Sequence, residues 1–265
     1  MKTEKMYLWK NVPGLCEEVP AITAYMPENK ATDISVVILP GGGYSARATH
    51  EGEGYAKFLN ENGIAAFVCD YRVRPHRFPL PLLDARRAIQ FVRYYADKYG
   101  INKDKVAIMG SSAGGHLAAL TATYSDVIEI ENRDEIDDEN FIPNAQILCY
   151  PVIKLASKKN GAHIGSCQNL LGDKALELAD DLTPEYLISK KTPKCFIWHT
   201  FEDRGVSVMN SLDYVKALKE NDVRTELHIF PEGNHGLGLA TGEDAVRKHV
   251  SQWGNLLINW LRFNF

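Results

Sequence analysis

The sequence predicts an α/β fold in which helices cover both faces of a mostly parallel sheet. Short apolar runs rich in β-branched residues alternate along the chain with amphipathic segments of helical period, and this alternation is typical of β-α-β units. The chain has 265 residues, of which 45% are hydrophobic, enough to enclose one large core. No repeat, low-complexity tract or flexible linker divides it, so we expect a single domain over residues 1–265.

Six apolar runs have the length and composition of buried strands, and they cover 33–40, 64–73, 104–110, 144–153, 194–200 and 224–230. The segments between them repeat their apolar residues every three or four positions, as amphipathic helices do. We therefore expect helices over 54–63, 82–92, 115–124 and 207–221, and a tail helix with one apolar stripe from Val246 to Trp260.

Residues 154–193 form a longer insertion, irregular or helical, between two predicted strands. Open α/β sheets bind their ligands outside the carboxyl ends of the strands. Because the insertion lies between two such ends, we expect it to form a small cap over a pocket.

Charge and hydropathy exclude several classes of partner. The 30 basic and 34 acidic residues give a net charge of −4 with both signs interspersed, which does not favour binding to nucleic acid or to an anionic membrane. We expect the acidic run over 129–140 to be a solvated loop. No stretch approaches the ~20 apolar residues of a membrane span, and the first residues lack an apolar signal segment. A cytoplasmic protein is expected.

The five cysteines suggest neither a disulfide framework nor a metal site. Their number is odd and no CxxC pair occurs, whereas frameworks and zinc sites need paired cysteines. Cys69, Cys149 and Cys195 lie in or beside apolar runs, which is typical of buried free thiols.

The segment IMGSSAGGHLA joins a predicted strand to a predicted helix through a turn of small residues. Gly110 to Gly114 match the pattern G-x-S-x-G, with Ser112 at its centre. In a nucleophile elbow the turn is tight and strained, so its flanking residues must be small, and the serine stands exposed above the sheet. We predict Ser112 as a nucleophile. Ser111 is the alternative, away from the centre of the pattern.

A serine hydroxyl is a weak nucleophile at neutral pH and needs a general base. His235 lies in the glycine-rich loop PEGNHGLGLA after the last predicted strand, and we predict it as the base. His199 ends a strand beside the candidate acid. The other histidines considered lie within strands or helices, or in loops with no evident partner: His50, His76, His116, His228 and His249.

The imidazole of a catalytic base needs a carboxylate that fixes its tautomer and stabilises its charged form. Asp203 follows the strand over 194–200, in the segment HTFEDRGVSV. We predict Asp203 for this role, and the adjacent Glu202 stays open as the alternative.

Three consecutive glycines in PGGGY, residues 40–44, follow the first buried strand. Such a run costs backbone entropy, and it is best explained by something that approaches the backbone closely. Its N–H groups, with that of Ala113, can bind a developing negative oxygen. The loop is therefore a candidate oxyanion loop.

Taken together, these motifs resemble the α/β-hydrolase superfamily, whose members order their triad as nucleophile, acid and base. The chain is most similar to bacterial carboxylesterases and acetylxylan esterases related to the hormone-sensitive lipase group, from about residue 20 to the end. The resemblance implies an α/β-hydrolase fold and gives a role to eight positions. Ser112, Asp203 and His235 match the triad, and the remaining matches are the oxyanion donors Gly42, Gly43 and Ala113 and the pocket-side aromatic residues Tyr44 and Tyr71. For each of these two tyrosines a place in the core stays open as the alternative.

The sequence departs from that group at two places. Pro40 replaces the histidine that usually precedes the three glycines, which argues against long-chain lipase activity. Ser207 replaces the proline that often follows the valine after the acid, and serine is a good residue for starting the next helix.

The resemblance implies a serine carboxylesterase for short acyl groups that deacetylates sugars or xylo-oligosaccharides without metal or organic cofactor. Its partner is then a small-molecule ester, and the sequence leaves open whether the chain forms a homo-oligomer. No residue indicates a sugar directly, so other functions of this fold remain open. They are an aryl-formamidase, a small peptidase of the prolyl-oligopeptidase type, and a ligand-binding protein without turnover.

Overall fold

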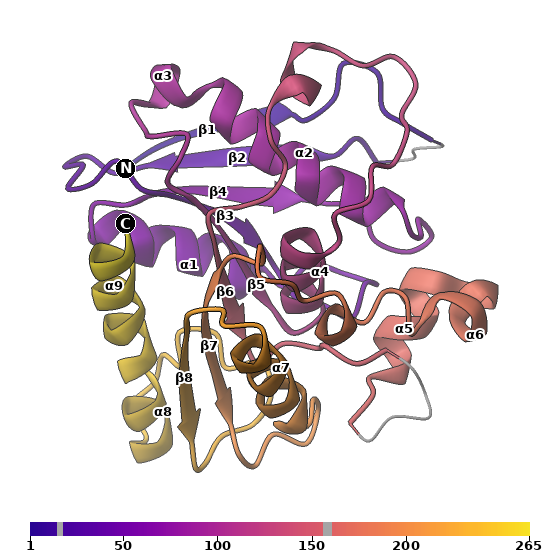
Figure 1. Ribbon diagram of the computed structural model, residues 1–265. Helices are drawn as coiled ribbons and strands as arrows, with labels where there is room; N and C mark the ends of the chain where they lie inside the picture. Colours follow the sequence, from indigo (N-terminus) through magenta and orange to yellow (C-terminus); the bar gives the residue numbers. More distant parts are fainter. Residues whose placement is uncertain (15–17, 156–160) are drawn as a thin grey trace.

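A central sheet runs through the computed structural model, which describes residues 1–14, 18–155 and 161–265 (Figure 1). Within these residues the sheet has eight strands in the order β1-β2-β4-β3-β5-β6-β7-β8. β2 is antiparallel to both of its neighbours, β1 and β4. The strands β4, β3, β5, β6, β7 and β8 are parallel to one another. The bounds are β1 Lys2–Tyr7, β2 Ala21–Met26, β3 Ser35–Leu39, β4 Ala65–Asp70, β5 Val106–Ser111, β6 Ala145–Cys149, β7 Lys194–Thr200 and β8 Thr225–Phe230.

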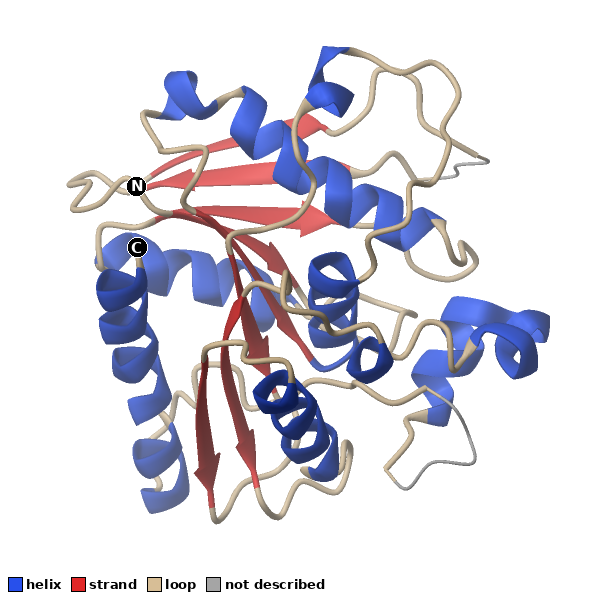
Figure 2. Cartoon of the chain, viewed as in Figure 1, coloured by secondary structure: helices blue, strands red, loops and turns tan. Residues whose placement is uncertain are grey.

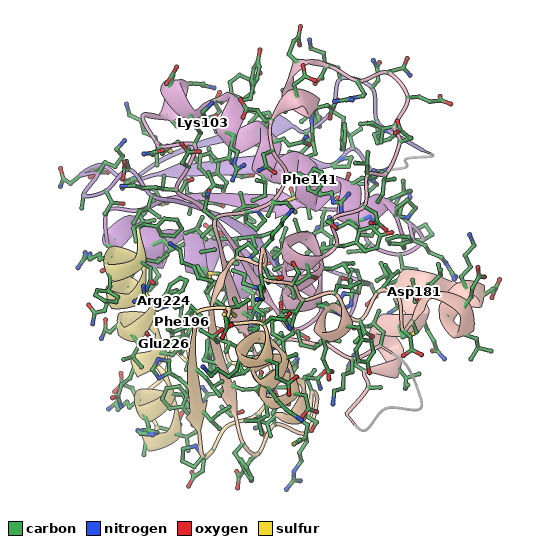
Figure 3. The ribbon with its side chains drawn as sticks, viewed as in Figure 1. Lys103, Phe141, Asp181, Phe196, Arg224 and Glu226 are labelled. Carbon is green, nitrogen blue, oxygen red and sulfur yellow. The ribbon has the colours of Figure 1, made fainter. Side chains whose placement is uncertain are left out.

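Helices cover both faces of this sheet, as Figure 2 shows. One apolar core lies under α1 (Thr49–Glu61), α8 (Ala245–Val250) and α9 (Gln252–Asn264). In that core the ring of Phe196 (Figure 3) packs on Trp260, with 5.7 Å between the ring centroids. The other core lies under α2 (Leu80–Tyr94), α4 (Ser112–Thr123) and α7 (Met209–Glu220), and the short α3 (Ala96–Tyr99) follows α2.

The six strands and five helices predicted from periodicity are present, with shifted ends. α1 begins five residues before its expected start at residue 54, and α4 begins at Ser112 itself. The tail is two helices, because Ser251 ends α8 and precedes α9. Cys69, Cys149 and Cys195 are buried free thiols, as expected.

The first two strands, β1 and β2, were not predicted from the sequence. β1 is largely exposed and pairs on one side only, with β2. Its residues Lys2, Glu4 and Lys5 suit an edge strand, which charged side chains protect from further pairing. β2 is buried against β4, where Ile22 pairs with Cys69, and its six residues carry too short a pattern to stand out.

The expectation of a solvated acidic loop over 129–140 was wrong in part. Arg87 of α2 is 1% exposed, and its guanidinium pairs with Asp134 and Asp137, each at 2.7 Å. A buried cation needs such partners, so these two acids fix the loop on α2. Other acids of the run, such as Asp138, are exposed.

Within the insertion over 154–193 the structure has α5 (Ile164–Leu171) and α6 (Ala175–Leu178), which extend away from the sheet (Figure 1). A short 3-10 turn at Gly172–Lys174 joins these two helices, and a second follows at Pro184–Tyr186. The buried Asn210 of α7 anchors the start of the insertion. Its side-chain oxygen accepts hydrogen bonds from the N–H groups of Ile153 and Lys154 at 2.9 Å, and its side-chain nitrogen donates to the Gly161 carbonyl at 2.8 Å. Residues 156–160 lie outside the described part of the chain.

None of the helices in the described residues has both the length and the apolar character needed to cross a bilayer.

Candidate active site

The parallel strands place the candidate residues at one edge of the sheet. Ser112 follows β5, Asp203 follows β7, His235 follows β8, and the glycine loop follows β3. Because parallel strands present their carboxyl ends at the same edge, four segments far apart in the sequence meet there.

Ser112 occupies a strained turn between β5 and α4. Its φ is +52°, in the left-handed region that non-glycine residues rarely adopt. The flanking glycines are required by close packing: a Cβ on Gly110 would lie 2.0 Å from the Gly114 oxygen, and one on Gly114 would lie 2.1 Å from the Leu39 oxygen. The alternative, Ser111, is fully buried, and its hydroxyl lies 3.0 Å from that of Tyr55.

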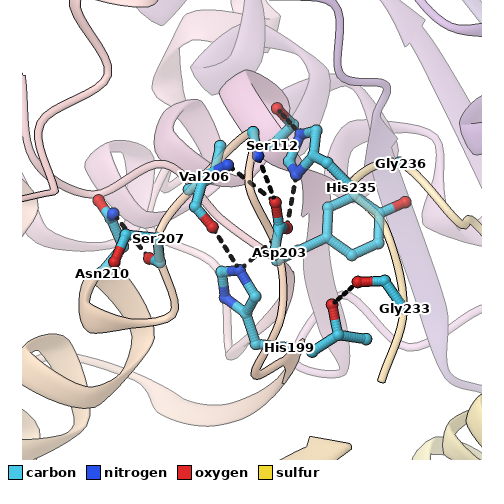
Figure 4. Close-up of polar contacts among 12 residues, drawn as sticks. Ser112, His199, Asp203, Val206, Ser207, Asn210, Gly233, His235 and Gly236 are labelled. Carbon is cyan, nitrogen blue, oxygen red and sulfur yellow. Dashed lines mark hydrogen bonds and ion pairs between the residues drawn. The ribbon is translucent and has the colours of Figure 1, made fainter. Parts of the chain in front are cut away.

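The side chains of Ser112, His235 and Asp203 form a continuous line (Figure 4). His235 Nε2 lies 2.8 Å from Ser112 Oγ, and His235 Nδ1 lies 2.7 Å from Asp203 Oδ2. A carboxylate can only accept, so Nδ1 carries the proton and Nε2 is free to accept the serine proton. The imidazole is 26% exposed, so this candidate base can be reached from solvent.

Asp203 accepts four hydrogen bonds. The Gly205 and Val206 N–H groups donate to Oδ1 at 2.8 and 2.9 Å, and two imidazoles donate to Oδ2. Burial alone would raise the pKa of this carboxyl, but the bonds from His199, His235 and Val206 outweigh it and hold the pKa well below 3.8. Glu202, the open alternative, is exposed and does not take this place.

The second imidazole on Asp203 belongs to His199, which the sequence analysis placed only beside the acid. This fully buried side chain brings Nε2 to 3.2 Å from Asp203 Oδ2 and 3.0 Å from the Val206 carbonyl oxygen. Both neighbours are acceptors, so Nε2 carries the proton. Nδ1 lies 2.7 Å from Ser211 Oγ, which holds the ring from its other side.

The glycine loop lies beside the elbow, as expected for an oxyanion loop. Within the described residues, the N–H groups of Gly42 and Gly43 donate to no protein acceptor. Ala113 is the second residue of α4, where a helix leaves its N–H without an intrahelical partner. These three N–H groups are available to a substrate oxygen.

The expectation that Tyr44 and Tyr71 line the pocket is corrected by their burial, since both are fully buried. The Tyr44 hydroxyl lies 2.7 Å from Nδ1 of His116, whose Nε2 donates to the Leu182 carbonyl at 2.9 Å. The Tyr71 hydroxyl donates to the Pro40 carbonyl at 2.6 Å. Both phenols support the glycine loop from inside the core.

The insertion adds two residues that the sequence analysis did not single out. Asn169 of α5 donates from Nδ2 to the Gly43 carbonyl at 2.8 Å, so it holds the glycine loop from the side of the insertion. His163 is the N-cap of α5; burial first, and then the charge of His235, lower its pKa, while the charge of Asp203 opposes them. His163 precedes the first residue of α5 and Asn169 lies in its last turn, so the amphipathic pattern of this short helix is the signal that could have indicated them.

No group of three or more histidine, cysteine or acidic side chains in the described residues is arranged to hold a metal ion. The constellation at the sheet edge is therefore built from a serine, two histidines, one carboxylate and backbone N–H groups.

Comparison with known proteins places this constellation in a family. The model of the BD-FAE family matches residues 22–218, which include the glycine loop, the elbow and the candidate acid. The chain belongs to the BD-FAE family.

Two curated relatives match this BD-FAE domain over most of its length. It is 36% identical to the endo-1,4-beta-xylanase B of Butyrivibrio fibrisolvens over 85% of the chain, and 34% identical to an acetylxylan esterase of Xylanibacter ruminicola over 91% of the chain. The alignments cover only 36% and 48% of those two proteins, so the chain spans less than half of each.

Solved structures match the whole BD-FAE chain and confirm the α/β-hydrolase fold. An acetyl ester-xyloside bifunctional hydrolase from Caldicellulosiruptor lactoaceticus is 40% identical, with a TM-score of 0.89 over 98% of this chain and 96% of that one. The carboxylesterase Cest-2923 from Lactobacillus plantarum WCFS1 is 26% identical, with a TM-score of 0.80 over 99% of this chain and 98% of that one.

Proposed function

We propose that this protein is a serine carboxylesterase that removes short acyl groups, above all acetyl, from sugars or xylo-oligosaccharides. The observation that carries the proposal is the line of hydrogen bonds from Ser112 through His235 to Asp203, at 2.8 and 2.7 Å. It has the geometry of nucleophile, base and orienting acid.

In the first half of the reaction Ser112 Oγ attacks the ester carbonyl carbon while His235 Nε2 takes the serine proton. The carbonyl oxygen becomes an anion, which the N–H groups of Gly42, Gly43 and Ala113 stabilise. Asp203 stabilises the imidazolium. The tetrahedral intermediate then expels the alcohol, which takes the proton from Nε2, and an acyl-serine remains.

In the second half a water molecule repeats the cycle. His235 takes a proton from the water as its oxygen attacks the acyl carbon, and the same N–H groups stabilise the second oxyanion. The intermediate releases the acid, and the proton returns to Ser112 Oγ. All groups used in these steps belong to the protein, the ester and water.

The choice of substrate rests on relatives. The acetylxylan esterase and the acetyl ester-xyloside hydrolase are similar to this chain at 34% and 40% identity. The insertion is proposed as a cap over the site, since Asn169 donates from it to the Gly43 carbonyl of the glycine loop. We further propose that residues 1–265 act as one domain.

The test is acetate release from acetylated xylo-oligosaccharides, measured beside hydrolysis of p-nitrophenyl esters of increasing chain length. Wild type and Ser112→Ala are assayed together. We expect acetate release that Ser112→Ala lowers by at least about a thousandfold, because the nucleophile is lost.

Four other results would change the proposal. Turnover of p-nitrophenyl acetate alone would keep the esterase and remove the sugar substrate. Cleavage of formamides or prolyl peptides in place of esters would identify one of the two amide-cleaving alternatives. Tight ligand binding without product would favour a non-catalytic protein, and full activity in Ser112→Ala would refute the triad.

A further inference from the structure

A buried carboxylate lies behind the glycine loop and takes no part in the mechanism above. Glu51, in the first turn of α1, is 3% exposed. Its Oε2 accepts the Gly41 N–H at 2.8 Å, and its Oε1 accepts the Tyr150 hydroxyl at 2.7 Å. Of the basic side chains in the described residues, only the His50 imidazole comes within ion-pair range of this carboxylate, with Nε2 at 3.8 Å from Oε1. A buried carboxylate with so little charge compensation is costly.

Tyr150 connects this carboxylate to the candidate base. It follows β6 with a φ of +36°, a strained conformation for a tyrosine, and it is 1% exposed. Its hydroxyl accepts the Gly238 N–H at 2.9 Å, in the loop that carries His235. Its ring packs edge-on to the His235 imidazole, with 5.2 Å between centroids. Burial first, and then the Glu51 charge, raise the pKa of this phenol far above 10, so it stays a proton donor.

The nucleophile elbow joins the same network through Tyr55. The Tyr55 hydroxyl lies 3.1 Å from the Tyr150 hydroxyl and 3.0 Å from Ser111 Oγ. Since Tyr150 must donate to the carboxylate, Tyr55 can donate to Tyr150 and Ser111 can donate to Tyr55. The hydrogen bonds then run in one direction from donor to acceptor, with the Glu51 carboxylate as the last acceptor, so each hydroxyl donates once.

We propose that Glu51 and Tyr150 are positioning residues that fix the positions of the glycine loop, the His235 loop and the elbow relative to one another. Glu51 fixes the start of the glycine loop through Gly41, and Tyr150 fixes the His235 ring and the Gly238 backbone. The pair acts through these groups and touches no substrate. The inference deepens the proposed function and rests on it.

Tyr150→Phe and Glu51→Gln test the pair, because each variant keeps the shape of the side chain it replaces. Phenylalanine leaves the Gly238 N–H and Glu51 Oε1 without their partner. Glutamine can keep its oxygen on Gly41, but its amide nitrogen then donates to the Tyr150 oxygen, so the Tyr150 proton has to turn from residue 51 toward Tyr55 and the order of donors is reversed. Tyr214→Phe is the matched control, because it too removes a buried phenol hydroxyl, bonded at 2.9 Å to Gln146.

The readouts are kcat and KM for p-nitrophenyl acetate, the affinity for phenylboronic acid, and the melting temperature. A boronic acid adds to the serine oxygen as a tetrahedral anion, so its affinity reports the arrangement of nucleophile, base and N–H donors without turnover. Displacing such groups by about 1 Å can cost on the order of a hundredfold in rate. We expect kcat and boronate affinity to fall together by roughly ten- to a hundredfold in both variants, with KM within about threefold of wild type.

Tyr214→Phe is expected to leave kcat, KM and boronate affinity within about threefold of wild type, whatever its effect on melting. The inference is overturned if Tyr150→Phe and Glu51→Gln match this control, or if they raise KM and leave kcat and boronate affinity unchanged. A wild-type protein that hydrolyses esters with both variants unaffected refutes the positioning role alone. A wild type that neither hydrolyses esters nor binds the boronate refutes the proposed function, and the inference with it.

Discussion

Replacing Asp203 with asparagine should abolish most esterase activity while leaving the fold intact. The carboxylate accepts two backbone N–H groups at Oδ1 and two imidazole N–H groups at Oδ2. Asparagine has the same shape but only one acceptor oxygen. That oxygen has to stay on the Gly205 and Val206 N–H groups, which have no other partner, so the amide NH2 has to face His235 and His199.

The amide then donates to His235 Nδ1 and drives the imidazole proton to Nε2. In that tautomer Nε2 donates toward Ser112 and cannot take its proton. The equivalent exchange in a serine protease lowers kcat by about four orders of magnitude. We expect a loss of roughly 10³- to 10⁴-fold here, which corresponds to about 4–5 kcal/mol at 1.36 kcal/mol per factor of ten.

Glu202→Gln is the matched control, since it removes the same charge from the adjacent, exposed residue. Both variants are assayed for kcat and KM with p-nitrophenyl acetate and for melting temperature. Glu202→Gln should stay within about twofold of wild type, as surface changes away from a site usually do. If Asp203→Asn kept activity within tenfold of Glu202→Gln, the assignment of the acid and the tautomer argument would both fail.

Two further predictions concern stability. Gly114→Ala places a Cβ 2.1 Å from the Leu39 oxygen, whereas a Cβ at Gly54 of α1 meets nothing within 4 Å. In urea unfolding, Gly114→Ala should therefore be destabilised by more than about 3 kcal/mol, and the control Gly54→Ala stabilised by about 0.5–1 kcal/mol. Equal unfolding midpoints for the two variants would contradict the packing of the elbow. Burial lowers the pKa of His116 from 6.5 to about 4, so the unfolded chain binds this proton first and the fold loses on the order of 3 kcal/mol as pH falls between those values. His116→Gln, which can keep both hydrogen bonds, should remove that part of the acid sensitivity, and an unchanged slope of unfolding free energy against pH would refute it.

The parallel part of the fold was predictable because its signal is local. Runs such as 33–40 and 194–200 have continuous apolar centres, VVIL and CFIW, as is typical of strands buried on both faces, and glycines mark several of their ends. β1 carries no such signal, since it is an exposed edge strand whose position depends on pairing with β2. The break at Ser251 was missed because the apolar stripe continues across it.

The candidate triad was predictable for a related reason. Ser112, Asp203 and His235 each follow a recognisable strand, and parallel strands bring their carboxyl ends together. Side-chain direction is not given by this rule. Tyr44 lies next to the glycine loop in sequence and yet points into the core toward His116. His199 was missed as a partner of Asp203 because its bond depends on how the chain turns after β7.

The burial of Glu51 could have been predicted from the helical period of the sequence. Extending the helical period of α1 backward from Leu59 through Tyr55 reaches Glu51, four residues apart at each step, so all three lie on one face of the helix. The other two are apolar or aromatic and fully buried, and an acid on such a stripe has to enter the core. Because burying a carboxylate without a strong counter-ion destabilises a fold, the position calls for a compensating role. The contacts with Gly41 and Tyr150 supply one, since they place the carboxylate between the glycine loop and the loop that carries His235.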